Sequence, residues 1–265
     1  MPEVTIGEVR IAYERAGAGP PLVLLHGGFG FDSRSWRPQF DALAAILTVV
    51  AWDMPGCGRS SDPPTGFRDA DVADSLAAFI EALGLERPHV LGLSFGAALA
   101  LELFRRHPTV PKSLVLASAY AGWAGSLPPE MVEQRIQRVS QALDLPAEQW
   151  AREWTPSMLS PSAPPKLVHE VEALLADFHP AGQRAILRAF AHQDLRDVLP
   201  RIGVPTLLLY GEKDVRSPVS VGEDLHAQIP GSQLVVISGV GHMCNLEAPE
   251  RFNAEVRRFL RPAVS

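Results

Sequence analysis

The chain has 265 residues, of which 46% are hydrophobic and 20% charged, a composition typical of one large α/β domain with or without an insertion. A formal net charge of −6 offers no basic face to nucleic acid and no polybasic patch to a membrane. Two isolated cysteines, Cys57 and Cys244, indicate no disulfide framework, and the sequence has neither a membrane-spanning apolar run nor a signal-peptide pattern. We expect a soluble, cytoplasmic protein and leave its oligomeric state open.

The first half of the chain alternates predicted strands and helices. Continuous apolar runs predict strands that are covered on both faces, and a polar–apolar alternation near the start predicts a hairpin. The predicted ranges are 5–13 for the hairpin, 22–25, 48–52, 88–91 and 112–117 for strands, and 35–47, 72–83 and 97–106 for helices. This order predicts an α/β fold with a mostly parallel sheet flanked by helices.

A serine stands where one of these strands turns into a helix, in Gly92-Leu93-Ser94-Phe95-Gly96. Such a turn is sharp and strained, and glycines two residues before and after it let neighbouring elements pass close by. It lifts the serine hydroxyl out at the carboxyl end of the sheet. The five letters alone fit an ordinary Gly/Ser turn equally well. Their setting between strand and helix favours Ser94 as a nucleophile.

The pattern changes after the predicted strand at 112–117. Residues 119–199 contain predicted helices at 129–142 and 166–177 and no convincing strand, and a cluster of prolines interrupts this stretch. The cluster comprises Pro156, Pro161, Pro164 and Pro165. Strands at 204–210 and 233–237 and a helix at 248–260 follow. We therefore expect a core formed by 1–118 and 200–265, with 119–199 inserted as a helical cap.

A serine nucleophile needs a base, and the base needs an orienting acid. His242 follows the last predicted strand and precedes the final helix, which makes it the best base among the eight histidines. Asp214 directly follows the strand at 204–210, and Glu212 is a competitor that we rank lower. An ionised Asp214 would fix the tautomer of His242 and stabilise the imidazolium. Activity should fall in acid as His242 becomes protonated.

A glycine-rich loop follows the strand at 22–25, in the sequence His26-Gly27-Gly28-Phe29-Gly30. Such a loop can turn a backbone N–H toward the serine. Together with the N–H of Phe95, it would bind the oxygen that becomes anionic in a tetrahedral intermediate. The sequence leaves open whether Gly28 or Phe29 supplies the first donor. We expect His26 to be structural.

Together these elements resemble the α/β-hydrolase fold family over nearly the whole chain. The motifs are His26-Gly27-Gly28, the loop from Asp53 to Ser60, Gly92 to Gly96, Gly211 to Asp214, and Gly241-His242. The resemblance implies a Ser-His-Asp hydrolase that cleaves small to medium carboxylic esters or lactones through an acyl-enzyme, similar to capped esterases, enol-lactonases and acyl-homoserine lactonases. It implies that the Asp53 to Ser60 loop only shapes the structure beside the site.

Some members of the family fit these residues poorly. Haloalkane dehalogenases and epoxide hydrolases carry aspartate where Ser94 stands, and hydroxynitrile lyases use a lysine where Met243 stands. Carbon–carbon bond hydrolases, perhydrolases and a non-catalytic ligand receptor remain alternatives, because a fold does not fix a function. No group of His, Cys, Asp and Glu shows metal-ligand spacing, so we expect neither a metal nor another cofactor.

Residues near the motifs and in the cap supply candidate contacts to a small-molecule substrate. The predicted contacts are Phe29, Phe95, Trp123, Met131, Trp154 and Met243. For most of the cap residues of this set, packing between cap helices is the favoured explanation. Arg135, Arg138 and Arg152 fit solvated helix faces as well as they fit substrate contacts, so the sequence favours neutral acyl substrates.

Overall fold

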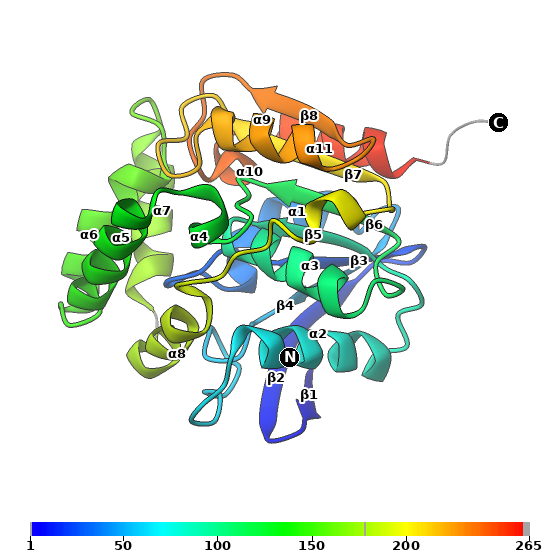
Figure 1. The fold of residues 1–265 in the computed structure, drawn as a ribbon, viewed down its shortest axis with the longest axis horizontal. Helices are drawn as coiled ribbons and strands as arrows, with labels where there is room; N and C mark the ends of the chain where they lie inside the picture. Colours follow the sequence, from blue (N-terminus) through cyan, green and yellow to red (C-terminus); the bar gives the residue numbers. More distant parts are fainter. Residues whose placement is uncertain (1, 178, 262–265) are drawn as a thin grey trace.

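The computed structural model describes residues 2–177 and 179–261, which build an eight-stranded sheet flanked by helices (Figure 1). The strands are β1 Glu3–Ile6, β2 Val9–Ala16, β3 Pro21–Leu25, β4 Thr48–Trp52, β5 His89–Leu93, β6 Ser113–Ala117, β7 Thr206–Gly211 and β8 Gln233–Ile237. Their order in the sheet is β1-β2-β4-β3-β5-β6-β7-β8. Only the β1–β2 and β2–β4 pairs are antiparallel. The predicted hairpin and the mostly parallel sheet are confirmed.

The central strands are buried along their whole length, which explains why their sequences are continuous apolar runs. Their register brings the carboxyl ends together, since Leu25 pairs with Gly92 and Ala117 pairs with both Leu93 and Leu209. Loops that leave these strands therefore meet at one edge of the sheet, where ligands bind in open α/β sheets.

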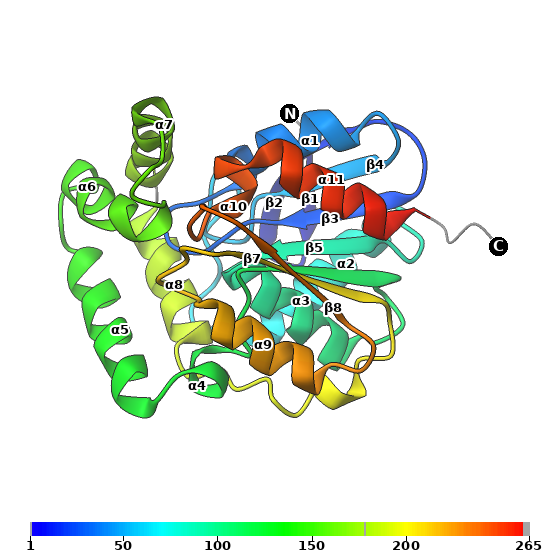
Figure 2. The ribbon, with the colours of Figure 1, turned by 90° about the horizontal axis from the view of Figure 1, so that it is seen from above.

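Helices cover both faces of the sheet (Figure 2). Helices α1 (Arg37–Leu43) and α11 (Pro249–Leu260) pack together on one face. On the other face lie α2 (Asp69–Ala82), α3 (Phe95–Arg106) and α9 (Val219–Gln228). The short α10 (Cys244–Glu247) precedes α11.

One predicted helix is shorter than expected. Instead of a helix over 35–47, a 3-10 turn at Ser33–Trp36 leads into α1, which ends at Leu43. The side chain of Asp32 caps the turn by accepting a hydrogen bond from the N–H of Arg34 at 2.8 Å. Pro38, which has no N–H to donate, then stands in the first turn of α1, where a helix tolerates proline.

Five helices lie between β6 and β7, on the left in Figure 1. They are α4 Trp123–Ser126, α5 Pro129–Ala142, α6 Ala147–Met158, α7 Pro165–Ala176 and α8 Pro180–Phe190. The predicted helices at 129–142 and 166–177 correspond to α5 and α7. Of the four clustered prolines, Pro156 stands inside the last turn of α6, a helix that was not among those predicted. At that position it removes a single backbone hydrogen bond.

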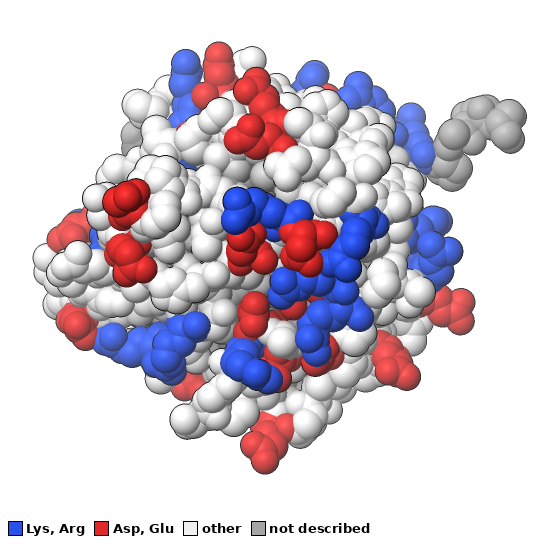
Figure 3. Space-filling model, viewed as in Figure 1, with Lys and Arg blue, Asp and Glu red and all other residues white. Residues whose placement is uncertain are grey.

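Within the described residues, no helix combines the length and the apolar character needed to cross a bilayer. On the face seen in Figure 3, basic and acidic side chains are interspersed, and no large area carries one sign of charge. Ion pairs such as Arg106–Asp74, at 2.6 Å, join side chains of opposite charge at the surface.

Candidate active site

Ser94 sits in the strained turn between β5 and α3. Its φ of 53° and ψ of −108° lie in a region that side chains other than glycine rarely adopt. A Cβ on Gly92 would lie 2.2 Å from the carbonyl oxygen of Gly96, and one on Gly96 would lie 2.1 Å from that of Leu25. Both positions therefore exclude a side chain. The backbone N–H of Ser94 donates to the carbonyl of Ala117 at 2.7 Å, which anchors the turn to β6.

His242 and Asp214 form a buried pair. Nδ1 of His242 lies 2.8 Å from Oδ2 of Asp214, and a carboxylate only accepts, so Nδ1 carries the proton. The other oxygen of Asp214 accepts from the backbone N–H groups of Arg216 and Ser217 at 2.8 and 2.9 Å. The hydroxyl of Ser118 donates to the carbonyl of His242 at 2.9 Å. The pair is thus held from both sides, and Nε2 keeps its lone pair.

Several contacts keep Asp214 ionised. Burial by itself would raise the pKa of this carboxyl. The charge of His242, the hydrogen bond to it and the two backbone N–H bonds outweigh burial, and the pKa lies below its ordinary value. Asp214 is therefore a carboxylate at neutral pH.

Glu212, the competing acid, lies elsewhere. Its side chain is exposed, accepts from the backbone N–H of Gly239 at 2.9 Å and approaches Lys213 at 3.8 Å. The structure therefore places Asp214, and not Glu212, against His242.

The loop after β3 lies against the start of α3. Phe29 has a φ of 57°, and a Cβ on Gly28 would lie 3.0 Å from Cγ of Phe95. None of the hydrogen bonds recorded within residues 2–177 and 179–261 uses the backbone N–H of Gly28, Phe29 or Phe95. These three donors remain available to a ligand.

His26 and Asp53 brace the neighbouring loops. The buried imidazole of His26 donates from Nδ1 to the carbonyl of Gly27 at 2.7 Å and accepts the N–H of Met54 at Nε2 at 3.0 Å. Burial lowers the pKa of His26, which keeps it neutral. Asp53 accepts from Nε of Arg59 at 3.0 Å. These bonds agree with the structural role expected of His26.

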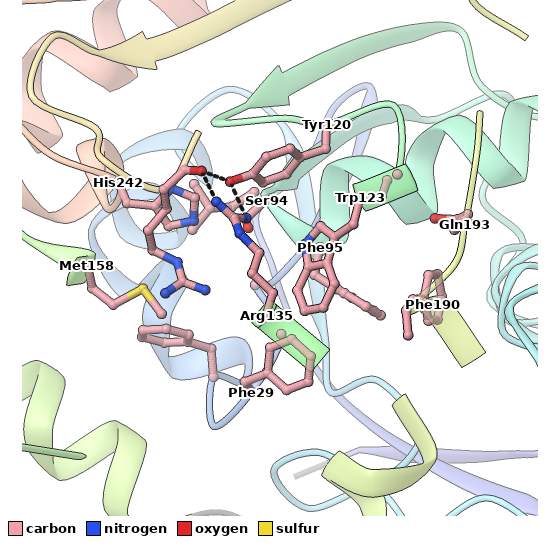
Figure 4. Close-up of a pocket in the computed structure, with 18 of the residues that line it drawn as sticks. Phe29, Ser94, Phe95, Tyr120, Trp123, Arg135, Met158, Phe190, Gln193 and His242 are labelled. Atoms are coloured by element: carbon pink, nitrogen blue, oxygen red, sulfur yellow. Dashed lines mark hydrogen bonds between the residues drawn. The ribbon is translucent and has the colours of Figure 1, made fainter. Parts of the chain in front are cut away.

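Ser94 and His242 line one cavity, shown in Figure 4. Most of its wall is apolar and comes from the loop after β3, the start of α3, the inserted helices and the residue after His242. The apolar side chains are Phe29, Phe31, Leu93, Phe95, Ala98, Trp123, Met158, Phe190, Ala191 and Met243. Phe29 meets Phe95 edge-on with ring centres 6.2 Å apart, and Phe95 meets Phe190 at 4.0 Å.

The cavity brings together four of the six predicted substrate contacts, namely Phe29, Phe95, Trp123 and Met243. The other two are not among its described lining residues. Met131 lies on α5 and is 43% exposed. Trp154 is buried in a stack with Trp150, at 4.3 Å between ring centres, and below the guanidinium of Arg216. Helix α5 therefore turns Met131 toward solvent, and α6 turns Trp154 into its packing with Trp150 and Arg216.

The sequence missed the polar part of the cavity wall. Tyr120, Arg135, Gln193 and Arg216 all line it. The sequence left open whether Arg135 lies on a solvated helix face or at the substrate. Arg135 shares a helical face with the buried Val132, Val139 and Ala142, at spacings of three, four and three residues. That periodicity is the signal that would have placed it inward.

Hydrogen bonds tie the insertion to the loop that carries Asp214. Arg135 on α5 donates to the hydroxyl of Tyr120 at 2.9 Å and to the carbonyl of Arg216 at 2.7 Å (Figure 4). The hydroxyl of Tyr120 also donates to the carbonyl of Arg216. On the other side, the N–H of Met243 donates to the carbonyl of Met158 at 2.9 Å. The insertion therefore contacts the residues that flank both Asp214 and His242.

A family model described as the alpha/beta hydrolase fold matches residues 20–249, most of the chain. The protein is an α/β-hydrolase. It is 29% identical over 252 residues to a putative carbamate hydrolase, RutD, of Cronobacter turicensis, with 89% of each chain covered.

Two solved structures extend the comparison. A thermophilic esterase from Thermogutta terrifontis superimposes on this α/β-hydrolase with a TM-score of 0.89 at 30% identity, covering 97% of this chain and 95% of the other. Est816, described as an N-acyl homoserine lactone degrading enzyme, has a TM-score of 0.85 at 28% identity, with 98% and 100% covered. The resemblance inferred from the motifs is confirmed at the level of the family and the fold.

Among the described residues of this α/β-hydrolase, no group of three or more His, Cys, Asp and Glu side chains is placed to hold a metal ion. What the cavity offers instead is a half-buried serine hydroxyl, an oriented histidine and unengaged backbone donors.

Proposed function

We propose that this α/β-hydrolase cleaves carboxylic esters or lactones with small to medium acyl groups, using Ser94 as nucleophile, His242 as base and Asp214 as the acid that orients it. The main support is the 2.8 Å distance between Nδ1 of His242 and Oδ2 of Asp214, beside a cavity that both His242 and Ser94 line. The Thermogutta terrifontis esterase and the N-acyl homoserine lactone degrading enzyme Est816 support the proposal, because both share the fold of this chain.

In the proposed reaction, Ser94 attacks the carbonyl carbon of the bound substrate while Nε2 of His242 takes the hydroxyl proton. The imidazolium is stabilised by the ionised Asp214. His242 then gives the proton to the departing alkoxide, which leaves an acyl group on Ser94. Water, deprotonated by His242, hydrolyses this acyl-enzyme and restores the serine.

The oxyanion that forms in each step needs donors. The N–H of Phe95 and the N–H of Gly28 or Phe29 are proposed to bind it, since none of the three has a partner among the described residues. Losing one such donor typically costs about 2.7–4 kcal/mol of transition-state stabilisation.

Residues 119–199 are proposed to act as a cap on the core formed by 1–118 and 200–265. Trp123, Met158, Phe190 and Arg135 bring this segment into the cavity wall. A substrate would lie between these side chains and the core residues Phe29, Phe95 and Met243, shielded from most of the solvent.

The test is acid release in a pH-stat from 4-nitrophenyl butyrate, from ethyl butyrate and from an acyl-homoserine lactone, with Ser94→Ala as the blank. Turnover of an ester or lactone by the wild type, reduced by at least about 10³-fold in Ser94→Ala, is expected. Equal release by the two proteins would exclude Ser94 as the nucleophile. Release from none of the substrates by the wild type would refute ester and lactone hydrolysis.

A further inference from the structure

Arg135 and Arg216 give the mostly apolar wall of the cavity a cationic part. Arg135 already uses both terminal nitrogens, on Tyr120 and on the carbonyl of Arg216. Arg216 donates from Nη1 to the hydroxyl of Ser157 at 3.0 Å. Its remaining guanidinium N–H groups make no recorded hydrogen bond within the described chain. Arg216 therefore presents unused donors at a cavity wall.

Neither guanidinium has an acidic partner among the described residues. Other partly buried arginines pair closely with carboxylates, as in Arg105–Glu102 at 2.5 Å and Arg59–Asp53 at 3.0 Å. Asp214 accepts the backbone N–H of Arg216, and its carboxylate is committed to His242. A partly buried charge without a partner destabilises the fold. An anionic group on a bound ligand would compensate this charge.

The position and charge of Arg216 are both well defined. Its guanidinium lies over the ring of Trp154 at 4.5 Å, which together with Ser157 restricts its orientation. Burial lowers the pKa of Arg216 to about 10, so the side chain remains protonated at neutral pH.

We propose that Arg216, supported by Arg135, binds a carboxylate on the substrate, so that the preferred ester or lactone carries an anionic group at one end. The inference rests on the proposed function and names its substrate class. A carboxylate fits better than a phosphate dianion, because both terminal nitrogens of Arg135 are already engaged and the planar fork of Arg216 matches two carboxylate oxygens. The apolar wall of Phe29, Phe95 and Phe190 then suits a hydrocarbon segment between the charge and Ser94. This replaces the preference for neutral acyl substrates that the sequence suggested.

The first test measures binding and does not require turnover. Titration calorimetry compares adipate with its neutral diamide, adipamide, on wild type and on Arg216→Gln. We expect the wild type to bind adipate at least roughly tenfold more tightly than adipamide, and Arg216→Gln to lose that preference. Arg138→Gln is the matched control, because Arg138 also stacks on Trp154, at 5.4 Å, but is exposed and is not among the described lining residues. Absence of adipate binding, or equal binding by Arg216→Gln, would overturn the inference.

The second test asks whether the anion is used in catalysis. The ratio of kcat/KM for 4-nitrophenyl hydrogen adipate to that for 4-nitrophenyl hexanoate reports a carboxylate on the acyl side. The same ratio for 4-carboxyphenyl and phenyl hexanoate reports the alcohol side. We expect one ratio to exceed one and to fall roughly tenfold in Arg216→Gln through KM, but to be unchanged in Arg138→Gln. If both ratios were insensitive to Arg216, the inference would fail although hydrolysis by Ser94 stood. If the wild type showed no Ser94-dependent hydrolysis of any of these esters, the result would count against the proposed function. The calorimetry would then still test whether Arg216 binds a carboxylate.

Discussion

At the scale of single residues, the candidate site depends on how Asp214 is held. Its carboxylate accepts one hydrogen bond from His242 and two from backbone N–H groups. An asparagine there would keep an oxygen for the backbone donors, but its amide could no longer favour the Nδ1–H tautomer of His242. A substitution of Asp214 by asparagine should therefore impair catalysis without disturbing the fold.

We expect Asp214→Asn to lower kcat by about 10⁴-fold and to change the melting temperature little. The measurements are ester hydrolysis and thermal unfolding followed by circular dichroism. Glu212→Gln serves as control, because Glu212 is exposed and accepts a hydrogen bond from the backbone N–H of Gly239. If Glu212→Gln abolished turnover and Asp214→Asn did not, the assignment of the acid would be wrong.

Two arginines, Arg135 and Arg216, show how far the orientation of a side chain can be predicted from the sequence. Arg135 carries a periodic signal on α5 that can be read from the sequence. Arg216 stands in a loop, where no periodicity indicates which way a side chain points. Only the fold of the loop after β7 places it at the cavity.

At the scale of elements, α8 is seated by a contact between two backbones. A Cβ on Gly182 would lie 2.1 Å from the carbonyl oxygen of Gly56. The next residue, Gln183, accepts from the N–H of Gly30 at 3.2 Å and approaches the carbonyl of Gly56 at 3.4 Å. Helix α8 also carries Phe190 into the cavity wall. The seating of this helix therefore determines part of the cavity shape.

Gly182→Ala tests this contact because two effects oppose one another. Alanine in a helix is favoured over glycine by about 0.5–1 kcal/mol. The steric clash with Gly56 outweighs that gain, so we expect a net destabilisation of about 1–3 kcal/mol and a lower kcat/KM.

Urea unfolding and ester kinetics measure the two effects of Gly182→Ala. A Cβ on Gly203 would meet nothing within 4 Å, so Gly203→Ala is the control and should change stability by less than about 0.5 kcal/mol. A stabilised Gly182→Ala protein would show that α8 moves freely away from Gly56.

At the scale of the whole molecule, one carboxylate joins the insertion to the loop that carries His242. Glu247 accepts from the backbone N–H of Gly241 at 2.7 Å and from that of Ser160, which follows α6, at 3.0 Å. The N–H of Met243 reaches back to Met158 beside them. These bonds make the position of the insertion and that of His242 interdependent.

We expect Glu247→Ala to speed hydrogen exchange at the amides of Gly241 and Ser160 and to lower kcat. Each backbone N–H left without a partner costs about 1–3 kcal/mol. Exchange measured by mass spectrometry should leave peptides of β3 and β5 unchanged. Glu250→Ala, an exposed position on α11, is the control. Unchanged exchange at Ser160 in Glu247→Ala would show that the insertion does not depend on this bridge.

The sheet, the strand-to-helix turn at Ser94 and the residues Asp214 and His242 can all be located from the sequence. Their signals are local, because apolar runs define buried strands and the chemistry follows directly after strand ends. The predicted helix at 35–47 was too long, since a 3-10 turn capped by Asp32 precedes α1 and α1 ends at Leu43.

The inner surface of the cavity could not be read in the same way. Helical spacing tells which side chains share a face, but not which face meets the core. Met131 points to solvent and Arg135 to the cavity because α5 docks through Tyr120 and Arg216, far away in sequence. Long-range contacts of this kind exist only in the folded chain. These contacts determined which side chains line the cavity, including its two arginines, whereas the catalytic candidates follow from the order of residues alone.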